Sequence, residues 1–355
     1  MKALRVAALL IAAGVCSSLA LAQGGTASVI DLTTNTVVSR FFSGTDSACV
    51  NWGSNSVAYV MQEEGLVKYD MTVSPPNPVY QFEGVGGKFA VNPANTRVLL
   101  SEFLLDVSST PFTVLFGTPD IPQANDMAFY SAGTRAVMVD STTFYVLDLT
   151  VSPPTNTSVT LPDDGLVVRV NPAGTRAVVT LDDNGGLQVV DLTVSPPVLI
   201  GTPVGPLSPA DPQGVAIIPN GTRAIYVDES NPTAEANVID ITAAPSLVNT
   251  VPITLLTELS AVVVNPVTAQ ILIRGDEGVG IMSAPYTSLG TVITDPGFTG
   301  GTTYGLAVNP AGTRAIVLNE DSPASFGVPT LSPWMLALLA LALGSAGFLL
   351  LTRRA

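Results

Sequence analysis

The chain has 355 residues, of which 28 are acidic and 14 basic, so its net charge is −14, and it contains no histidine. A surface this acidic repels nucleic acid, which excludes a function in binding DNA or RNA. Without histidine, the copper, haem, iron or zinc sites that need His ligands are excluded, and so are hydrolases that activate Ser or Cys with a His base.

Residues 1–22 have the pattern of a secretory signal peptide. Lys2 and Arg5 supply the charged start, residues 6–15 form a ten-residue apolar core, and small residues precede a cleavage site between Ala22 and Gln23. We therefore expect an exported protein that begins at Gln23.

A strand-like unit then recurs seven times between residues 23 and 320. It reads apolar run, Asn-Pro-Ala-Gly-Thr-Arg, apolar run, and is clearest at residues 170–177 and 308–315. The Arg position of successive copies lies 38 to 47 residues apart, at Ser56, Arg97, Arg135, Arg176, Arg223, Gln270 and Arg314. A period in the forties with strand-like units predicts a β-propeller.

A second unit, apolar-x-Asp-Leu-Thr, alternates with the first. It opens the series at Asp31, whereas the Asn-Pro-Ala-Gly-Thr-Arg unit closes it at Arg314. Seven copies of each half make seven blades only if the first half-blade pairs with the last. The order therefore predicts an all-β, seven-bladed β-propeller over residues 23–320, with the N-terminal strands completing the final blade.

The local chemistry agrees with strands and turns. Residues 176–181 and 187–193 are short runs rich in β-branched side chains. Between runs, Asn171-Pro-Ala-Gly has the composition of a tight turn, because Pro fixes φ and Gly accepts a positive φ. We expect four strands in each unit, the outermost being the least regular.

These two units together resemble the repeat of the YVTN-type bacterial β-propellers. Residues 237–242 (Asn-Val-Ile-Asp-Ile-Thr) and 28–33 (Ser-Val-Ile-Asp-Leu-Thr) match its second half, and Ala58-Tyr-Val and Ile225-Tyr-Val loosely match its Tyr-Val step. The resemblance covers about residues 25–320. It implies the propeller architecture but no particular activity, because propellers include enzymes, binders and scaffolds.

Residues that recur around the ring are expected to serve the fold. We interpret the repeated Arg as covering or hydrogen-bonding the neighbouring turn or the repeated Asp. Trp52, which replaces Pro in the first copy, is interpreted as a packing residue. Cys49, the one cysteine that remains after signal cleavage, is expected to be a buried, inert thiol.

Two acidic clusters are the only metal candidates in the sequence, and they would suit calcium. They are Asp163 with Asp164 and Asp182 with Asp183. Neither has the spaced ligands of an EF-hand, and Asp-Asp-Gly is also an ordinary turn sequence. We expect no cofactor, with a weak calcium site as the alternative.

The C-terminal part consists of a linker at residues 321–327 and a segment at 328–355. This segment contains a short motif, an apolar span at about residues 334–351 and the basic pair Arg353 and Arg354, which places that end in the cytoplasm. It resembles the tripartite C-terminal sorting signals of Gram-negative bacteria of the Ile-Pro-Thr-Leu-x-x-Trp-Gly type. The motif residues are Val328, Pro329, Thr330, Leu331 and Trp334, with Val328 in place of Ile and Met335 in place of Gly.

The resemblance of the tail implies an exosortase-type membrane enzyme as a partner and transfer to the cell surface, whereas a plain membrane anchor is the alternative. Without Lys2, Arg5, Arg353 and Arg354, the exported part carries 10 basic against 28 acidic residues, a net charge of −18. We therefore expect a propeller in the periplasm or at the cell surface of a Gram-negative bacterium, anchored at least transiently in the inner membrane.

A non-enzymatic binding or structural module for an unknown protein or glycan ligand is the expected function, and an envelope assembly factor cannot be separated from it. The alternative is a carboxylate- or calcium-dependent propeller enzyme, lactonase-like or carbohydrate-active. Such an enzyme would need carboxylates from several blades that converge on the central channel.

Overall fold

The computed structural model describes residues 25–319, apart from 45–46, 48, 183–185, 206–211, 229–233 and 295–304. The chain divides into two units, and the repeats occupy the unit Gly24–Asp321. The predicted signal peptide with Ala22 and Gln23, the linker and the sorting segment with its apolar span lie outside the described residues. Within the described residues, no helix has the length and apolar character needed to cross a bilayer.

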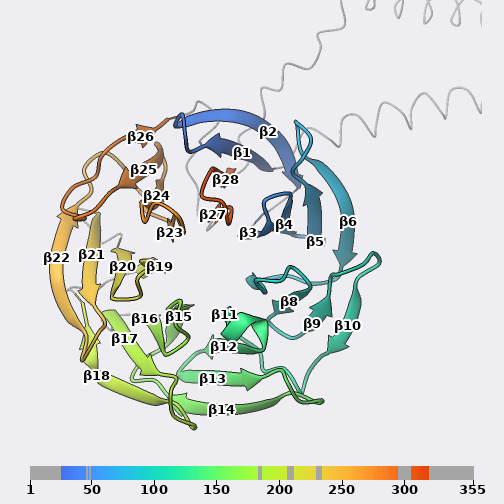
Figure 1. The fold of residues 1–355 in the computed structure, drawn as a ribbon, viewed down its shortest axis with the longest axis vertical. Helices are drawn as coiled ribbons and strands as arrows, with labels where there is room; N and C mark the ends of the chain where they lie inside the picture. Colours follow the sequence, from blue (N-terminus) through green and yellow to red (C-terminus); the bar gives the residue numbers. More distant parts are fainter. Residues whose placement is uncertain are drawn as a thin grey trace, which may run out of the picture. The chain divides into compact units, whose positions relative to one another are not determined.

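The described part of the chain forms seven four-stranded antiparallel sheets arranged as a ring of blades, which confirms the predicted seven-bladed propeller (Figure 1). Blades 1 to 3 consist of β3 (Cys49–Ser54), β4 (Val57–Gln62), β5 (Gly65–Asp70) and β6 (Asn77–Glu83); β7 (Phe89–Val91), β8 (Arg97–Leu100), β9 (Leu104–Asp106) and β10 (Thr113–Phe116); and β11 (Asp126–Tyr130), β12 (Arg135–Asp140), β13 (Thr143–Asp148) and β14 (Thr155–Thr160).

Blades 4 to 6 consist of β15 (Gly165–Val170), β16 (Arg176–Leu181), β17 (Gly186–Asp191) and β18 (Val198–Val204); β19 (Pro212–Ile217), β20 (Arg223–Asp228), β21 (Glu235–Asp240) and β22 (Ser246–Pro252); and β23 (Ala261–Val264), β24 (Ile271–Gly275), β25 (Gly278–Met282) and β26 (Val292–Ile293). The helical content of the described residues is one 3-10 turn, η1 (Ser131–Gly133).

The seventh blade joins the two ends of the repeat region, as the order of the half-units predicts. Its strand order is β2 (Thr36–Gly44), β1 (Gly25–Asp31), β28 (Arg314–Asn319) and β27 (Leu306–Val308). β1 pairs antiparallel with β28 from Thr26 opposite Asn319 to Asp31 opposite Arg314. Because every blade is completed within residues 24–321, this unit contains the partners that it needs to fold by itself.

Apolar side chains form one core at each junction between neighbouring blades. The seven buried clusters each combine residues from two adjacent blades, so every blade is packed against a neighbour on both of its faces. This explains why the strands are apolar at consecutive positions. Trp52 belongs to the junction of blades 1 and 7, where it is 6% exposed and donates from Nε1 to the Ala307 carbonyl at 3.2 Å. It is therefore a packing residue.

In each blade, the turn between the first and second strands and the turn between the third and fourth lie at the same end of the sheet. We call this end of the ring the repeat-turn face, because both repeated motifs lie there. At the first turn of blade 4, Asn171 Oδ1 accepts hydrogen bonds from the Thr175 and Arg176 amides at 2.9 and 3.0 Å. Gly174 closes this turn with φ +68°. Asn92 and Asn309 make the same bonds in their blades, so the repeated Asn fixes the turn.

The second repeated turn begins at the Asp of Asp-Leu-Thr. Asp191 Oδ1 accepts from both the amide and the hydroxyl of Thr193, at 2.8 and 2.6 Å. Five other blades repeat this bonding pattern, at Asp31, Asp70, Asp106, Asp148 and Asp240.

The repeated Arg connect this face from blade to blade. Arg176 donates from Nη1 to the carbonyls of Ile241 and Ala243 in the next blade, and Arg314 donates to the Met71 carbonyl at 3.3 Å. Arg135 lies 3.9 Å from Asp148 within its own blade. These contacts agree with the structural role inferred for the repeated Arg. In blade 1 the position opposite the repeated Asp70 is Val57, one residue beyond the Ser56 that the repeat spacing indicates.

Candidate functional site

The innermost strands of the seven blades surround a central channel. The channel has a volume of about 690 Å³ and is lined by β3, β7, β11, β15, β19, β23 and β27 together with residues that flank them. Most of the lining side chains are Ala, Val, Leu, Ile, Phe or Met. The charged residues of the lining are Lys88, Asp126 and Arg169, which come from three different blades. We call these three residues the channel cluster.

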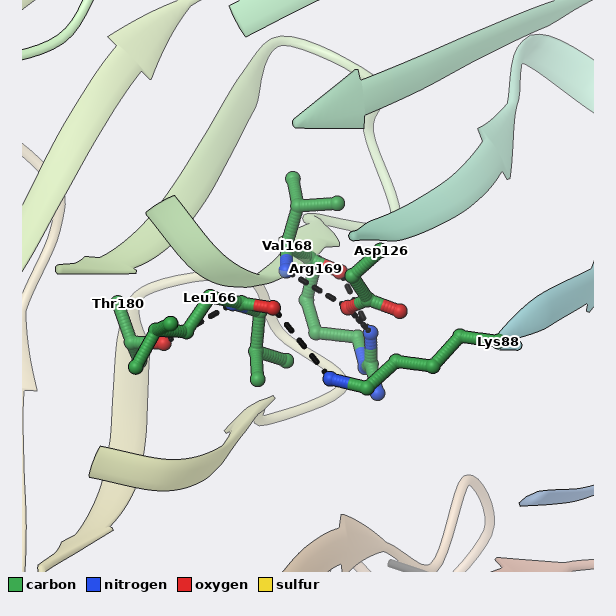
Figure 2. Close-up of polar contacts among 7 residues, drawn as sticks. Lys88, Asp126, Leu166, Val168, Arg169 and Thr180 are labelled. Carbon is green, nitrogen blue, oxygen red and sulfur yellow. Dashed lines mark hydrogen bonds and ion pairs between the residues drawn. The ribbon is translucent and has the colours of Figure 1, made fainter. Parts of the chain in front are cut away.

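The acid of the channel cluster, Asp126, is buried, and its Oδ2 accepts two hydrogen bonds. Asp126 begins β11 and is 3% exposed. Its Oδ2 accepts from Arg169 Nη1 at 2.7 Å and from the Val168 amide at 2.8 Å (Figure 2). Pairing with a guanidinium and an amide makes these charge-assisted hydrogen bonds, which are stronger than bonds between neutral groups.

Arg169 is the exposed partner of this pair. Its side chain is 41% exposed, and both of its hydrogen bonds use Nη1, one to Asp126 and one to the Val168 carbonyl at 2.6 Å. Within the described residues, the Nε and Nη2 atoms of Arg169 make no hydrogen bond. The guanidinium therefore retains donors that face a ligand space.

Lys88 completes the channel cluster from the other side. It precedes β7 in blade 2, and its Nζ donates to the Leu166 carbonyl in blade 4 at 3.4 Å (Figure 2). A register shift between Gly165 and Val167 leaves Leu166 without a partner on β16, and the Val167 amide bonds to Thr180 Oγ1 instead. This bulge in β15 makes the Leu166 carbonyl available to the channel.

The further polar residues of the lining are Asn51, Ser260 and Cys49. Ser260 Oγ accepts a 2.7 Å bond from Arg274 Nη1, and Arg274 is itself only 2% exposed. Cys49 belongs to β3 and is half-buried in the channel wall. Burial raises the pKa of the Cys49 thiol, Asp126 raises it further, and Lys88 and Arg169 act in the opposite direction. Cys49 thus lies within electrostatic range of the channel cluster and stays protonated at neutral pH.

The calcium candidates do not lie in this channel. Asp163 accepts a bond from the Asp164 amide at 2.9 Å, and the Asp164 carbonyl accepts from the Asp182 amide at 2.8 Å, so these residues form turns at the end of the ring opposite the repeat-turn face. Asp183 lies outside the described residues. In the part of the chain that the structure describes, no three acidic or Cys side chains are grouped closely enough to hold a metal ion.

Within the described residues, the channel lining contains one carboxylate, whereas the enzymatic alternative requires several. Asp126 supplies the one carboxylate of the described lining, and it is engaged by Arg169 and the Val168 amide. The lining offers two cations, one paired acid and an apolar wall, an arrangement that can hold and orient a ligand through charge and apolar contact.

The sequence analysis did not identify the channel cluster. One signal was available, because Arg169 interrupts the run Val167-Val168-Arg169-Val170 at a position where the equivalent residues Ala90 and Ala128 are small and apolar. A lone charge in an innermost propeller strand points to the channel.

Comparison with known proteins identifies only the fold. No family model matches the chain, and no curated protein matches it. Among solved structures it is similar to the Cps50 (Swd1) β-propeller domain of Myceliophteria thermophila, with a TM-score of 0.60 and 13% identity, covering 73% of this chain and 90% of that one.

It is also similar to hydrazine synthase of Kuenenia stuttgartiensis, with a TM-score of 0.56 and 12% identity, covering 78% of this chain and 96% of that one. At these identities the two likenesses show a shared propeller architecture and leave the function to the residues of the site.

Proposed function

We propose that this protein is an exported, envelope-displayed β-propeller that acts as a non-enzymatic binding module and holds its ligand in the central channel. The observation that carries the proposal is the channel cluster, a charged group from three blades on an otherwise apolar wall around about 690 Å³. Ligand pockets in proteins have this size and this mixture of apolar surface with few polar groups.

Non-enzymatic binding is favoured over the enzymatic alternative by what the channel lining contains. It has a single, engaged carboxylate in Asp126, and its thiol at Cys49 has a raised pKa. General acid–base work needs a group that is available to exchange a proton with the substrate.

The proposal is tested by filling the channel. In the domain of residues 24–321, Ala128→Trp places an indole in the channel lining, and Ala94→Trp at an exposed turn of the repeat-turn face is the matched control. The wild-type and control domains, purified from the native host, should carry a bound small molecule that native mass spectrometry detects and that Ala128→Trp lacks. A ligand retained by Ala128→Trp would place binding elsewhere, and conversion of the recovered ligand into a product would establish an enzyme.

Export and surface display are proposed from the two ends of the chain. The signal pattern at residues 1–22 and the motif at residues 328–334 support them. Replacing Pro329, Thr330 and Leu331 with Ala should cause a larger, membrane-retained form to accumulate in the native host, because the sorting enzyme would no longer recognise the motif. An unchanged mass and fractionation would instead indicate a plain C-terminal anchor.

A further inference from the structure

We propose that the channel binds a small amphiphilic monocarboxylate, with its carboxylate at Lys88 and Arg169 and its apolar chain along the inner strands. This inference rests on the proposed binding function and specifies the class of ligand. It follows from the charge balance of the lining, from the donors that Arg169 retains and from the apolar character of the remaining wall.

The charge balance favours an anion. Two cations and one acid line the channel, and the Asp126 charge is already neutralised by Arg169 Nη1 and the Val168 amide. A protein of net charge −14 thus has a locally positive site at its centre. The Arg169 guanidinium is the group best suited to a carboxylate, because its planar nitrogens can donate two parallel hydrogen bonds.

The geometry favours one carboxylate over a polyanion. The turns opposite the repeat-turn face carry acids such as Glu64 and Asp164, both of them exposed. These acids repel a chain of phosphates or sulfates, whereas a single carboxylate that reaches Arg169 and Lys88 gains their attraction at short range. The acids of these turns therefore disfavour the binding of large anions.

The wall favours an apolar body on the ligand. Val91, Phe129, Val170, Val264 and Val308 are half-buried apolar residues of the lining and come from five different blades. A purely polar anion would leave this wall in contact with water and would gain only the charge interaction. A medium-chain carboxylate satisfies both parts of the channel.

Cys49 provides a direct measure of channel occupancy. It lies in the channel lining and is the single cysteine of residues 24–321. At alkaline pH, where part of the thiol is ionised, a ligand in the channel should therefore slow the reaction of Cys49 with N-ethylmaleimide. Mass spectrometry quantifies this reaction. Octanoate is the probe, acetate has the same head group without the chain, and octan-1-ol has the same chain without the charge.

We expect octanoate to protect Cys49 at concentrations at least tenfold below those at which acetate or octan-1-ol does so. Arg169→Met and Lys88→Met should each weaken the protection by octanoate about tenfold, since each removes a charge-assisted hydrogen bond. Lys88→Met leaves the Asp126–Arg169 pair in place and thus keeps the test valid if Arg169→Met unfolds the domain. Arg223→Met makes the same change in net charge on the repeat-turn face and should bind octanoate like the wild type.

Equal protection by octanoate and octan-1-ol, unaffected by Arg169→Met and Lys88→Met, would overturn the carboxylate inference while leaving a binding channel in place. Absence of protection by all three probes, with a host ligand still lost in Ala128→Trp, would show that the channel takes another chemical class. If no ligand were lost in Ala128→Trp either, the proposed binding function would fail together with this inference.

Discussion

The repeat-turn face and the channel both contain arginine and aspartate, but the two regions use these residues in different ways. On the repeat-turn face, Asp191 is fixed by Thr193, a pattern that six blades share, and Arg176 donates to the carbonyls of the next blade. In the channel, Asp126 and Arg169 occur once and face a ligand-sized space. Residues that recur from blade to blade build the scaffold, whereas residues that occur once are available to bind a ligand.

Loss of ring closure should have the largest effect on the stability of the scaffold. Deleting residues 23–40 removes β1, which lies between β2 and β28, and exposes the edge of β28 together with the core around Ala27, Val29 and Ile30. We expect the truncated domain to lose cooperative folding, because several buried apolar side chains and a full ladder of hydrogen bonds disappear together.

The fluorescence of Trp52, at the junction of blades 1 and 7, reports this loss during thermal unfolding. A circular permutant that carries residues 23–44 behind residue 321 is the control, and it should melt close to the wild type. A deletion variant that melted within a few degrees of the intact domain would show that closure contributes little.

Removing the hydrogen bonds of one repeated turn should reduce the free energy of unfolding by less than the loss of ring closure does. Asn171→Ala removes the acceptor of the Thr175 and Arg176 amides and the donor to Thr175 Oγ1. We expect the free energy of unfolding to fall by about 1–3 kcal/mol, because buried polar groups lose their partners. Urea denaturation measures this change.

Asn220→Ala is the control, because the Asn220 side chain caps only the exposed Thr222. Its cost should stay below about 1 kcal/mol. Both variants should bind the channel ligand like the wild type, and altered Cys49 protection in Asn171→Ala would contradict the separation of the two regions.

Acid should weaken the repeat-turn face selectively. In each of the six repeated turns, the hydroxyl and then the amide of the following Thr or Ser hold the Asp pKa below its ordinary value of 3.8. Because the folded value is the lower one, the unfolded chain binds protons first as the pH falls. The stabilisation is complete above about pH 4 and is lost as the pH falls through the folded pKa values.

Replacing all six Asp with Asn retains the acceptor oxygen and removes the titration. Between about pH 5 and about pH 2.5, the melting temperature of the variant should fall less than that of the wild type. An equal acid dependence in the six-Asn variant would show that these carboxylates do not link folding to protonation.

The sequence predicts the scaffold because each half-unit carries its own bonding pattern. Asn171 and Thr175 lie in one turn, as do Asp191 and Thr193, so a local motif states each structure directly. The alternating order of the halves, from Asp31 to Arg314, also predicts the closing pair of β1 and β28.

The channel cluster could not be predicted in the same way. Lys88, Asp126 and Arg169 are single residues, each about one repeat from the next, and they meet only because the ring brings three blades to one axis. The β15 bulge that presents the Leu166 carbonyl to Lys88 depends on the Thr180 side chain, which no turn or repeat motif indicates. The lone charge of Arg169 indicates the channel, but the sequence of its blade does not show that Lys88 and Asp126 meet it there.

The closing blade also has a mechanical consequence. β28 is hydrogen-bonded along both edges, to β27 and to β1, and Asn319 at its end lies opposite Thr26. A pulling force applied at residue 319 is therefore divided between two ladders instead of being concentrated on one. β28 should therefore resist peeling better than a terminal strand that is paired along one edge only.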